Sequence, residues 1–246
     1  MNKLNALIKK NLKETLRDPL CTIFNLAFPV ILFVILNVVF VGSKFIPENF
    51  MPQNFVPGIC VLAYCFTMLT CSLTVAGDKT SSFMARIIVA PVKFSTYVIS
   101  VIISNLPVIA IQTILLYGLG FIFGLNICLE SFITIFYLLF SGIFYILLGT
   151  LIGLVVKNVK NAGPTCSILI NVISLLGGVF LPVSILSGAL KTIVNILPFI
   201  HTTQIASQVF VKGLGAIYPH VLIILGYSLM VIAFIYIASK KINKNY

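Results

Sequence analysis

Charged side chains are scarce in this sequence. They make up only 9% of its 246 residues, whereas 60% are hydrophobic. A soluble domain carries about 25% charged residues, so the composition excludes a water-soluble globular protein. The net charge of +11 could indicate nucleic-acid binding. Because the cations lie between apolar runs and form no aromatic-interleaved patch, membrane topology is favoured and no nucleic-acid partner is expected.

Acidic residues are missing from the interior of the apolar runs. The five that exist lie in gaps or at borders, namely Glu14, Asp18, Glu48, Asp78 and Glu130. Transport driven by a proton or sodium gradient usually needs an ionisable residue within the membrane, so it is disfavoured. A P-loop is excluded because the chain has no Gly-Lys pair. With no catalytic triad or paired carboxylates either, the chain is expected to be no enzyme.

Cysteine patterns for metal or disulfide chemistry are also missing. The six cysteines form no C-x-x-C pair and have no histidine nearby; they are Cys21, Cys60, Cys65, Cys71, Cys128 and Cys166. They are predicted to be small buried hydrophobic residues. A metal site is not expected, since the spacing offers no ligand set.

The long apolar runs predict an all-α membrane protein with six transmembrane helices. The spans are expected near residues 22–41, 55–76, 96–123, 131–156, 164–186 and 219–238, within one membrane domain of residues 20–246. No cleavable signal peptide is expected, because charges continue to Arg17 and Asp18. Polar residues inside the spans are expected to form helix-to-helix hydrogen bonds: Asn37, Asn105, Gln112 and Asn171.

Positive charge is distributed unequally between the gaps. Thirteen of the sixteen Lys and Arg residues lie before the first span, in the second and fourth gaps, or after the last span. Positive residues stay cytoplasmic, so both termini are predicted to be inside. The apolar stretch Ser187–Tyr218 is interrupted by Pro and Gly, and predicts a re-entrant outer hairpin of short helices. A seventh span is rejected, because it would place the C-terminal lysines outside.

Two patterns predict how helices lie and pack. Residues 1–19 form an amphipathic helix on the inner membrane surface, with its leucines on one face and its cations mostly on the rest, broken by Asp18 and Pro19. Small residues at helical spacing predict close packing within one bundle rather than at a subunit interface. They are Gly120, Gly124, Gly142, Gly149 and Gly153.

The most informative segment is the polar step Gly77–Ser95 between two apolar runs, which contains Asp78, Lys79, Arg86, Pro91 and Lys93. An acid followed eight residues later by an arginine, and then by Pro91 and Val92, resembles the cytoplasmic loop of permeases in the type-two ATP-binding-cassette exporter family. The Gly-Thr pair of that family would fall at Ser82 and Phe83, where this chain departs from the pattern.

The resemblance extends over nearly the whole chain. The basic helix ending in Arg17, Asp18 and Pro19 resembles the connecting helix of the family. The segment 55–58 resembles the beginning of its second span, and 177–182 with Leu197 and Pro198 resembles its fifth span and outer hairpin. Pro182 and Pro198 mark that hairpin.

This resemblance implies a bacterial inner-membrane half-transporter of six helices. It implies a second permease copy, identical or related, and cytosolic ATPase subunits that bind ATP and Mg, with no cofactor bound by this chain. Asp78, Lys79, Arg86 and Pro91 would form a coupling helix on the ATPase, with Arg86 pairing to an acid there. A plain solvated loop is the alternative for these side chains.

Function is then predicted as export of an amphipathic drug, peptide or lipid-like substrate by alternating access at the dimer seam, in contact with membrane lipid. Phe66, Leu73, Asn171 and Leu175 are predicted to line the path through the second and fifth spans. The alternatives are an ATP-independent channel, scramblase or immunity-type membrane protein, and a purely structural subunit of a membrane complex.

Overall fold

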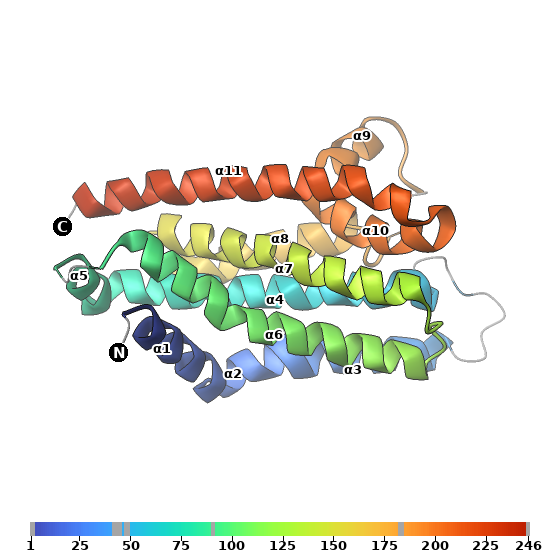
Figure 1. Cartoon of the computed structure of the whole chain (residues 1–246), viewed down its shortest axis with the longest axis horizontal. Coiled ribbons are helices and arrows are strands. Elements are labelled where there is room, and N and C mark those ends of the chain that lie inside the picture. Colours follow the sequence, from blue (N-terminus) through green and yellow to red (C-terminus); the bar gives the residue numbers. More distant parts are fainter. Residues whose placement is uncertain (1–2, 41–45, 47–49, 90–91, 182–184, 245–246) are drawn as a thin grey trace.

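The chain folds into a bundle of long helices that run along one axis (Figure 1). A computed structural model describes residues 3–40, 46, 50–89, 92–181 and 185–244. Within these residues all regular structure is helical. Six helices are long and apolar enough to cross a membrane, as the sequence predicts. The first helix begins and the last ends at the same end of the bundle, as an even number of crossings requires (Figure 1).

The elements follow the predicted order with small shifts at their ends. They are α1 (Lys3–Arg17), α2 (Pro19–Thr22), the π-helix η1 (Ile23–Ala27), α3 (Phe28–Phe40), α4 (Pro52–Thr80), α5 (Ser82–Val89), α6 (Phe94–Ile122), α7 (Leu129–Val155), α8 (Val159–Leu176), α9 (Gly188–Ile196), α10 (Pro198–Lys212), the short turn η4 (Leu214–Ala216) and α11 (Ile217–Lys244). The spans are Ile23–Phe40, α4, α6, α7, α8 and the Ile217–Lys241 part of α11.

The fifth span differs most from its predicted bounds of 164–186, because α8 ends at Leu176. Gly178 has a φ of +79°, which favours glycine and stops the helix. The Phe180 N–H returns to the Ser174 carbonyl at 3.2 Å, and the Gly177 N–H donates to the Ile173 carbonyl. This glycine-terminated end resembles a helix C-cap, so the apolar residues beyond Leu176 do not extend the span.

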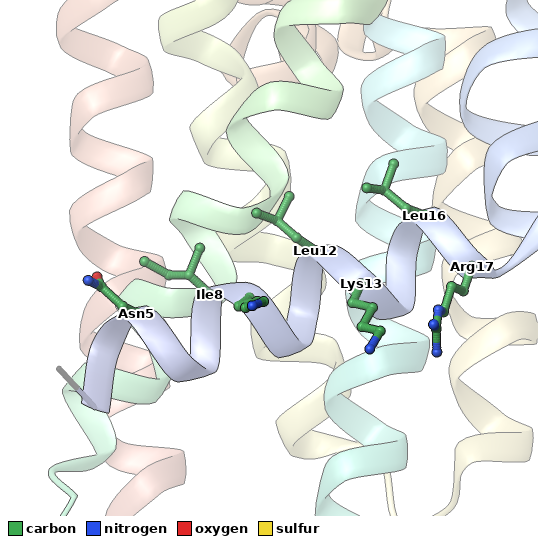
Figure 2. Close-up of a pocket in the computed structure, with 7 residues that line it drawn as sticks. Asn5, Ile8, Leu12, Lys13, Leu16 and Arg17 are labelled. Carbon is green, nitrogen blue, oxygen red and sulfur yellow. The ribbon is translucent and has the colours of Figure 1, made fainter. Parts of the chain in front are cut away.

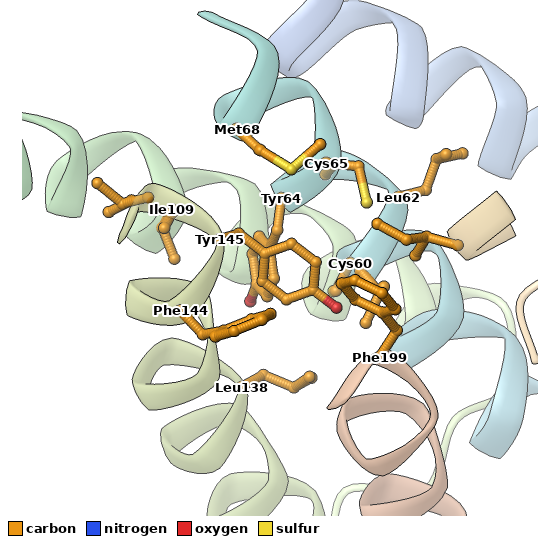
Figure 3. Packing of buried hydrophobic residues seen from close by; sticks show 14 of the residues in the cluster. Cys60, Leu62, Tyr64, Cys65, Met68, Ile109, Leu138, Phe144, Tyr145 and Phe199 are labelled. Carbon is orange, nitrogen blue, oxygen red and sulfur yellow. The ribbon is translucent and has the colours of Figure 1, made fainter. Parts of the chain in front are cut away.

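The core of the bundle is built around α4, which packs against α6, α7, α8 and α10. Aromatic rings fill its centre: Tyr64 of α4 meets Tyr145 of α7 at 5.8 Å between centroids, and Phe199 of α10 packs against Phe144 and Tyr145 (Figure 3). Because Phe199 belongs to α10, this short helix is part of the core. Four cysteines are buried, as predicted: Cys60, Cys65, Cys71 and Cys166.

Glycines allow neighbouring helices to approach within the bundle. A Cβ atom at Gly149 or Gly153 of α7 would meet the backbone of α4, and at Gly142 it would meet Ile109 of α6. Gly120 of α6 similarly lies against Val56 of α4. The predicted role in internal packing is therefore confirmed for these four residues. It is wrong for Gly124, which has a φ of +99° beyond the end of α6 and no neighbour within 4 Å of an added Cβ.

One buried amide holds three helices together. The side-chain amide of Gln112 on α6 donates to the Asn25 carbonyl at 2.8 Å and to the Ala63 carbonyl of α4 at 3.2 Å, and it accepts from Thr67. Asn25 lies in the π-helix η1, where the irregular turn changes the backbone hydrogen-bond pattern. The helix-to-helix prediction is confirmed for Gln112.

The same prediction is not confirmed for Asn37, Asn105 and Asn171. Asn37, Asn105 and Asn171 each donate to a carbonyl four residues earlier in their own helix. A side-chain amide can satisfy itself in this way without a neighbour, so residue type alone does not indicate an interhelical bond.

Two short helices, α9 and α10, form the predicted hairpin stretch at the end of the bundle opposite the termini (Figure 1). Helix α10 packs against α4, α7 and α11, whereas most α9 side chains are exposed. Pro198 is the first residue of α10, and Pro182 lies outside the described residues. That the hairpin re-enters a bilayer stays a prediction.

A histidine pair joins α10 to α11. The Nδ1 atoms of His201 and His220 lie 2.7 Å apart, and His220 Nε2 lies 3.2 Å from Gln208 Oε1. If His220 donates to Gln208, its Nδ1 accepts a hydrogen bond from His201, so the His220 ring is neutral. Burial lowers the pKa of His201 below its usual range.

Acidification is expected to weaken this contact. Because the folded pKa of His201 is depressed, the unfolded chain takes up the proton first, and stability is lost as pH falls below about 6.5. We expect the thermal stability of the purified chain to be lower at pH 5 than at pH 7.5. His201→Gln is expected to reduce this difference; an unchanged pH dependence in that variant would assign the effect to other groups.

Candidate functional site

The polar segment after α4 forms a short helix, α5, at the end of the bundle where the chain begins and ends (Figure 1). Helix α5 packs against α4. Its Ile87 is buried and its Phe83 is half-buried against the core, whereas Arg86 and Val89 are exposed. Phe83 and Ile87 are four residues apart and hold one face of α5 on the bundle. Arg86 lies to one side of this face and is exposed to solvent.

Asp78 is the centre of a buried ion-pair network at the end of α4. Its Oδ1 accepts a hydrogen bond from Lys10 of α1 at 2.5 Å, and its Oδ2 accepts one from the hydroxyl of Tyr97 on α6 at 2.8 Å. The Asp78 residue is 7% exposed. A buried carboxylate needs such partners to offset its loss of hydration. Asp78 therefore links α1, α4 and α6.

Lys10 extends this network to α5. Its ammonium also pairs with Glu14 at 2.9 Å and lies 4.3 Å from the centroid of the Phe83 ring. A cation over an aromatic face is attracted by the ring quadrupole. Phe83 is one of the two positions where the sequence departs from the Gly-Thr pattern. The departure supplies an aromatic contact between α1 and α5.

Lys79, the residue after Asp78, attaches the end of α4 to the end of α7. Its ammonium donates to the carbonyls of Leu154 at 2.6 Å and Val156 at 2.7 Å, at the C-terminal end of α7. The last carbonyls of a helix lack intrahelical donors and carry partial negative charge. The Lys79 ammonium supplies both the missing hydrogen bonds and a compensating positive charge. Asp78 and Lys79 thus attach the beginning of the α5 segment to α1, α6 and α7.

Arg86 differs from its two neighbours in the motif. It is exposed on α5 and forms no ion pair with a residue that the structure describes. A guanidinium in this position can pair with a carboxylate of another protein through two parallel hydrogen bonds. Pro91, the fourth predicted coupling residue, lies outside the described residues.

The four predicted path residues differ in their surroundings. Phe66 of α4 packs against Phe24 and Phe28 of the first span, at centroid distances of 6.0 and 5.2 Å. Leu73 is half-buried on α4, and Asn171 and Leu175 are exposed on α8. That these four line a substrate path stays a prediction.

The exposed face of α8 is unusually polar for a helix of this bundle. Along the exposed side lie Asn161, Thr165, Ser167 and Asn171, interspersed with apolar Ile168 and Val172. Helix surfaces that meet other helices in lipid are enriched in such hydroxyl and amide side chains, because hydrocarbon offers them no hydrogen bonds. The first span, in contrast, exposes only apolar side chains at Ile31, Ile35 and Val38.

Sequence reasoning missed two residues of the Asp78 network, Lys10 and Tyr97. Asp78 itself gave the only available signal, because an acid at the end of an apolar span requires a partner. Nothing in the pattern of sixteen Lys and Arg residues distinguishes Lys10 from its neighbours.

One family model matches most of the chain. The model of the family described as ABC-2 type transporter matches residues 2–211, which is most of the chain and includes α1, α4 and α5. No curated protein matches the sequence.

Proposed function

Since the chain belongs to the ABC-2 type transporter family, and is thus a permease subunit of an ABC transporter, we propose that it exports an amphipathic substrate. A separate cytosolic ATPase, which binds ATP and Mg, supplies the energy. Two permease copies alternate between inward-open and outward-open arrangements. The end of the bundle that carries α5 and both termini is cytoplasmic, in the bacterial inner membrane.

This proposal rests on how α5 is attached to the bundle. Its inner face is attached through Phe83 and Ile87, and the residues before it are bonded to three other helices through Asp78 and Lys79. Its Arg86 is exposed to solvent. A force applied to such a rigidly attached helix moves the bundle as a body, which a loose loop would not allow.

The polar exposed face of α8 supports a second permease copy. The Asn171 amide and the Thr165 hydroxyl each donate one hydrogen bond to a carbonyl of α8 itself. Their remaining N–H group and lone pairs find no partner in lipid, so a facing helix or a water-filled path stabilises them. Asn171 and Leu175 lie on this face. The apolar residues interspersed among them suit an amphipathic cargo.

Arg86→Glu is expected to abolish coupling to the ATPase. The substitution reverses the charge of an exposed side chain, so the chain should fold and insert normally, while a pair with an ATPase carboxylate becomes repulsive. Loss of a buried, hydrogen-bonded charge pair weakens binding by about 2–5 kcal/mol, which corresponds to at least about thirtyfold. The measurement is affinity between the purified chain and its ATPase, together with substrate-stimulated ATP hydrolysis.

Lys160→Glu is the matched control, since Lys160 is exposed on α8 at the same end of the bundle. It carries the same change of charge and should bind the ATPase like the unaltered chain. Equal affinity for Arg86→Glu and the unaltered chain would remove Arg86 from the interface and leave α5 as an ordinary solvated turn.

A further inference from the structure

The rotation of α1 about its own axis is fixed by polar bonds to the bundle. Lys10 pairs with Asp78, and the Asn11 side chain donates to Ser100 of α6 at 3.3 Å. Leu7 packs against the hydrophobic core, and α1 as a whole packs against α6. These contacts use one side of α1. The opposite side of α1 faces away from α6, and its orientation relative to the bundle is fixed by these bonds.

Two stripes of opposite character occupy that free side. Ile8, Leu12 and Leu16 follow one another at four-residue spacing, and Leu16 is 74% exposed. Lys9, Lys13 and Arg17 form a second stripe at the same spacing, all exposed and none in an ion pair with another described residue. Figure 2 shows the three apolar side chains pointing to the side where the first span continues, while Lys13 and Arg17 point the opposite way.

We propose that this face of α1 binds anionic phospholipid headgroups of the leaflet at that end of the bundle. A helix beside the end of a span lies at the depth of the headgroups. Its apolar stripe is directed toward the acyl chains, and its three cations reach the phosphates. A zwitterionic surface would satisfy the apolar stripe alone, so the cations make the site selective for negative lipid.

The lipid site is separate from the ion pair that orients α1. Lys10 is held by Asp78 and Glu14, so it contributes little to the outward charge. Two acids lie close to the basic stripe: Glu14, whose carboxylate is engaged by Lys10, and the exposed Asp18, which directly follows Arg17. The three cations outnumber them. The selectivity therefore rests on Lys9, Lys13 and Arg17. It concerns a surface that the ATPase-coupling proposal does not use.

A single reporter can test this selectivity, because the chain contains no tryptophan. Leu12→Trp places one in the apolar stripe. The full chain is reconstituted in vesicles of phosphatidylcholine and phosphatidylglycerol, with bromine on the acyl chains of one lipid or the other. Each cation near an anionic surface changes the local preference for anionic lipid by about fivefold. We therefore expect quenching by the two brominated lipids to show that phosphatidylglycerol is enriched around the tryptophan by about threefold or more over phosphatidylcholine.

Two further measurements separate charge recognition from simple insertion. The enrichment should fall in high salt, since screening weakens exposed charge pairs. It should be lost in Lys9→Gln/Lys13→Gln/Arg17→Gln and kept in Lys157→Gln/Lys160→Gln/Lys241→Gln, which removes three exposed cations elsewhere at the same end. Equal quenching by the two lipids, or enrichment that salt leaves unchanged, would overturn the proposal. Absence of quenching by either lipid would also overturn it, and would assign the face to a protein partner.

Discussion

Asp78→Ala is expected to detach α1 from the bundle and to destabilise the chain by about 2 to 3 kcal/mol. The substitution removes the acceptor of both Lys10 and Tyr97. The Tyr97 hydroxyl would remain buried without its partner. The effect stays at or below the lower end of the roughly 3–5 kcal/mol for fully buried pairs, because the Lys10 side chain is 24% exposed and keeps Glu14.

The measurement is unfolding of the purified chain in mixed micelles with a rising fraction of denaturing detergent, combined with limited proteolysis near Arg17. Asp78→Asn should be milder, because its single amide oxygen can still accept from Lys10 while its N–H₂ group can donate to the Tyr97 hydroxyl oxygen. Glu14→Ala is the control for an exposed ion pair, and should change stability by less than about 1 kcal/mol. If Asp78→Ala were no more sensitive to denaturing detergent and to proteolysis near Arg17 than Glu14→Ala, Asp78 would not hold α1 on the bundle.

Gly149→Ala is expected to separate α7 from α4 at the centre of the bundle. An added Cβ would lie well inside van der Waals distance of the Met68 carbonyl oxygen, a backbone atom that cannot move without its helix. Overpacking costs about 1–3 kcal/mol and occasionally more, which exceeds the gain of about 1 kcal/mol from the higher helix propensity of alanine. We expect a net loss of about 2 kcal/mol on the same unfolding measurement.

Gly118→Ala provides the matched control. Gly118 lies in α6 with nothing within 4 Å of an added Cβ, so only the change in propensity acts there. This variant should be as stable as the unaltered chain or slightly more stable. Comparable destabilisation by both substitutions would show that glycine is required for some other reason than the close approach of α4 and α7.

The bundle could be predicted from the sequence because long apolar runs have few alternatives in a membrane. The limits of the fifth span could not, since its end depends on Gly178 adopting a positive φ while apolar residues continue beyond it. For the stretch that forms α9 and α10, the sequence predicted short helices but neither their bounds nor their contacts. That Phe199 places α10 in the core depends on a tertiary contact with Phe144 and Tyr145.

The candidate site could be predicted in part. Spacing identified Asp78 and Arg86, and their different environments emerge only from the fold, which buries the first and exposes the second. The partners of Asp78 come from residues 68 positions earlier and 19 later. No local pattern encodes such pairs, because they depend on how α1 and α6 meet α4.

These contacts give different roles to residues that lie close together in the sequence. Asp78 and Lys79 attach the α5 segment to the bundle, and Arg86 is left for recognition of the ATPase in the mechanism we propose. Variants of Asp78 should then lower stability and coupling together. Variants of Arg86 should lower coupling alone, and this difference distinguishes an internal anchor from a docking contact.

The most direct test of the whole account is substrate flux in proteoliposomes that contain the chain alone or together with the cytosolic ATPase that we propose as its partner. We expect flux only when the ATPase and ATP are both present, and loss of flux in Arg86→Glu but not in Lys160→Glu. Flux through the chain alone, independent of nucleotide, would contradict the account and indicate a channel or scramblase.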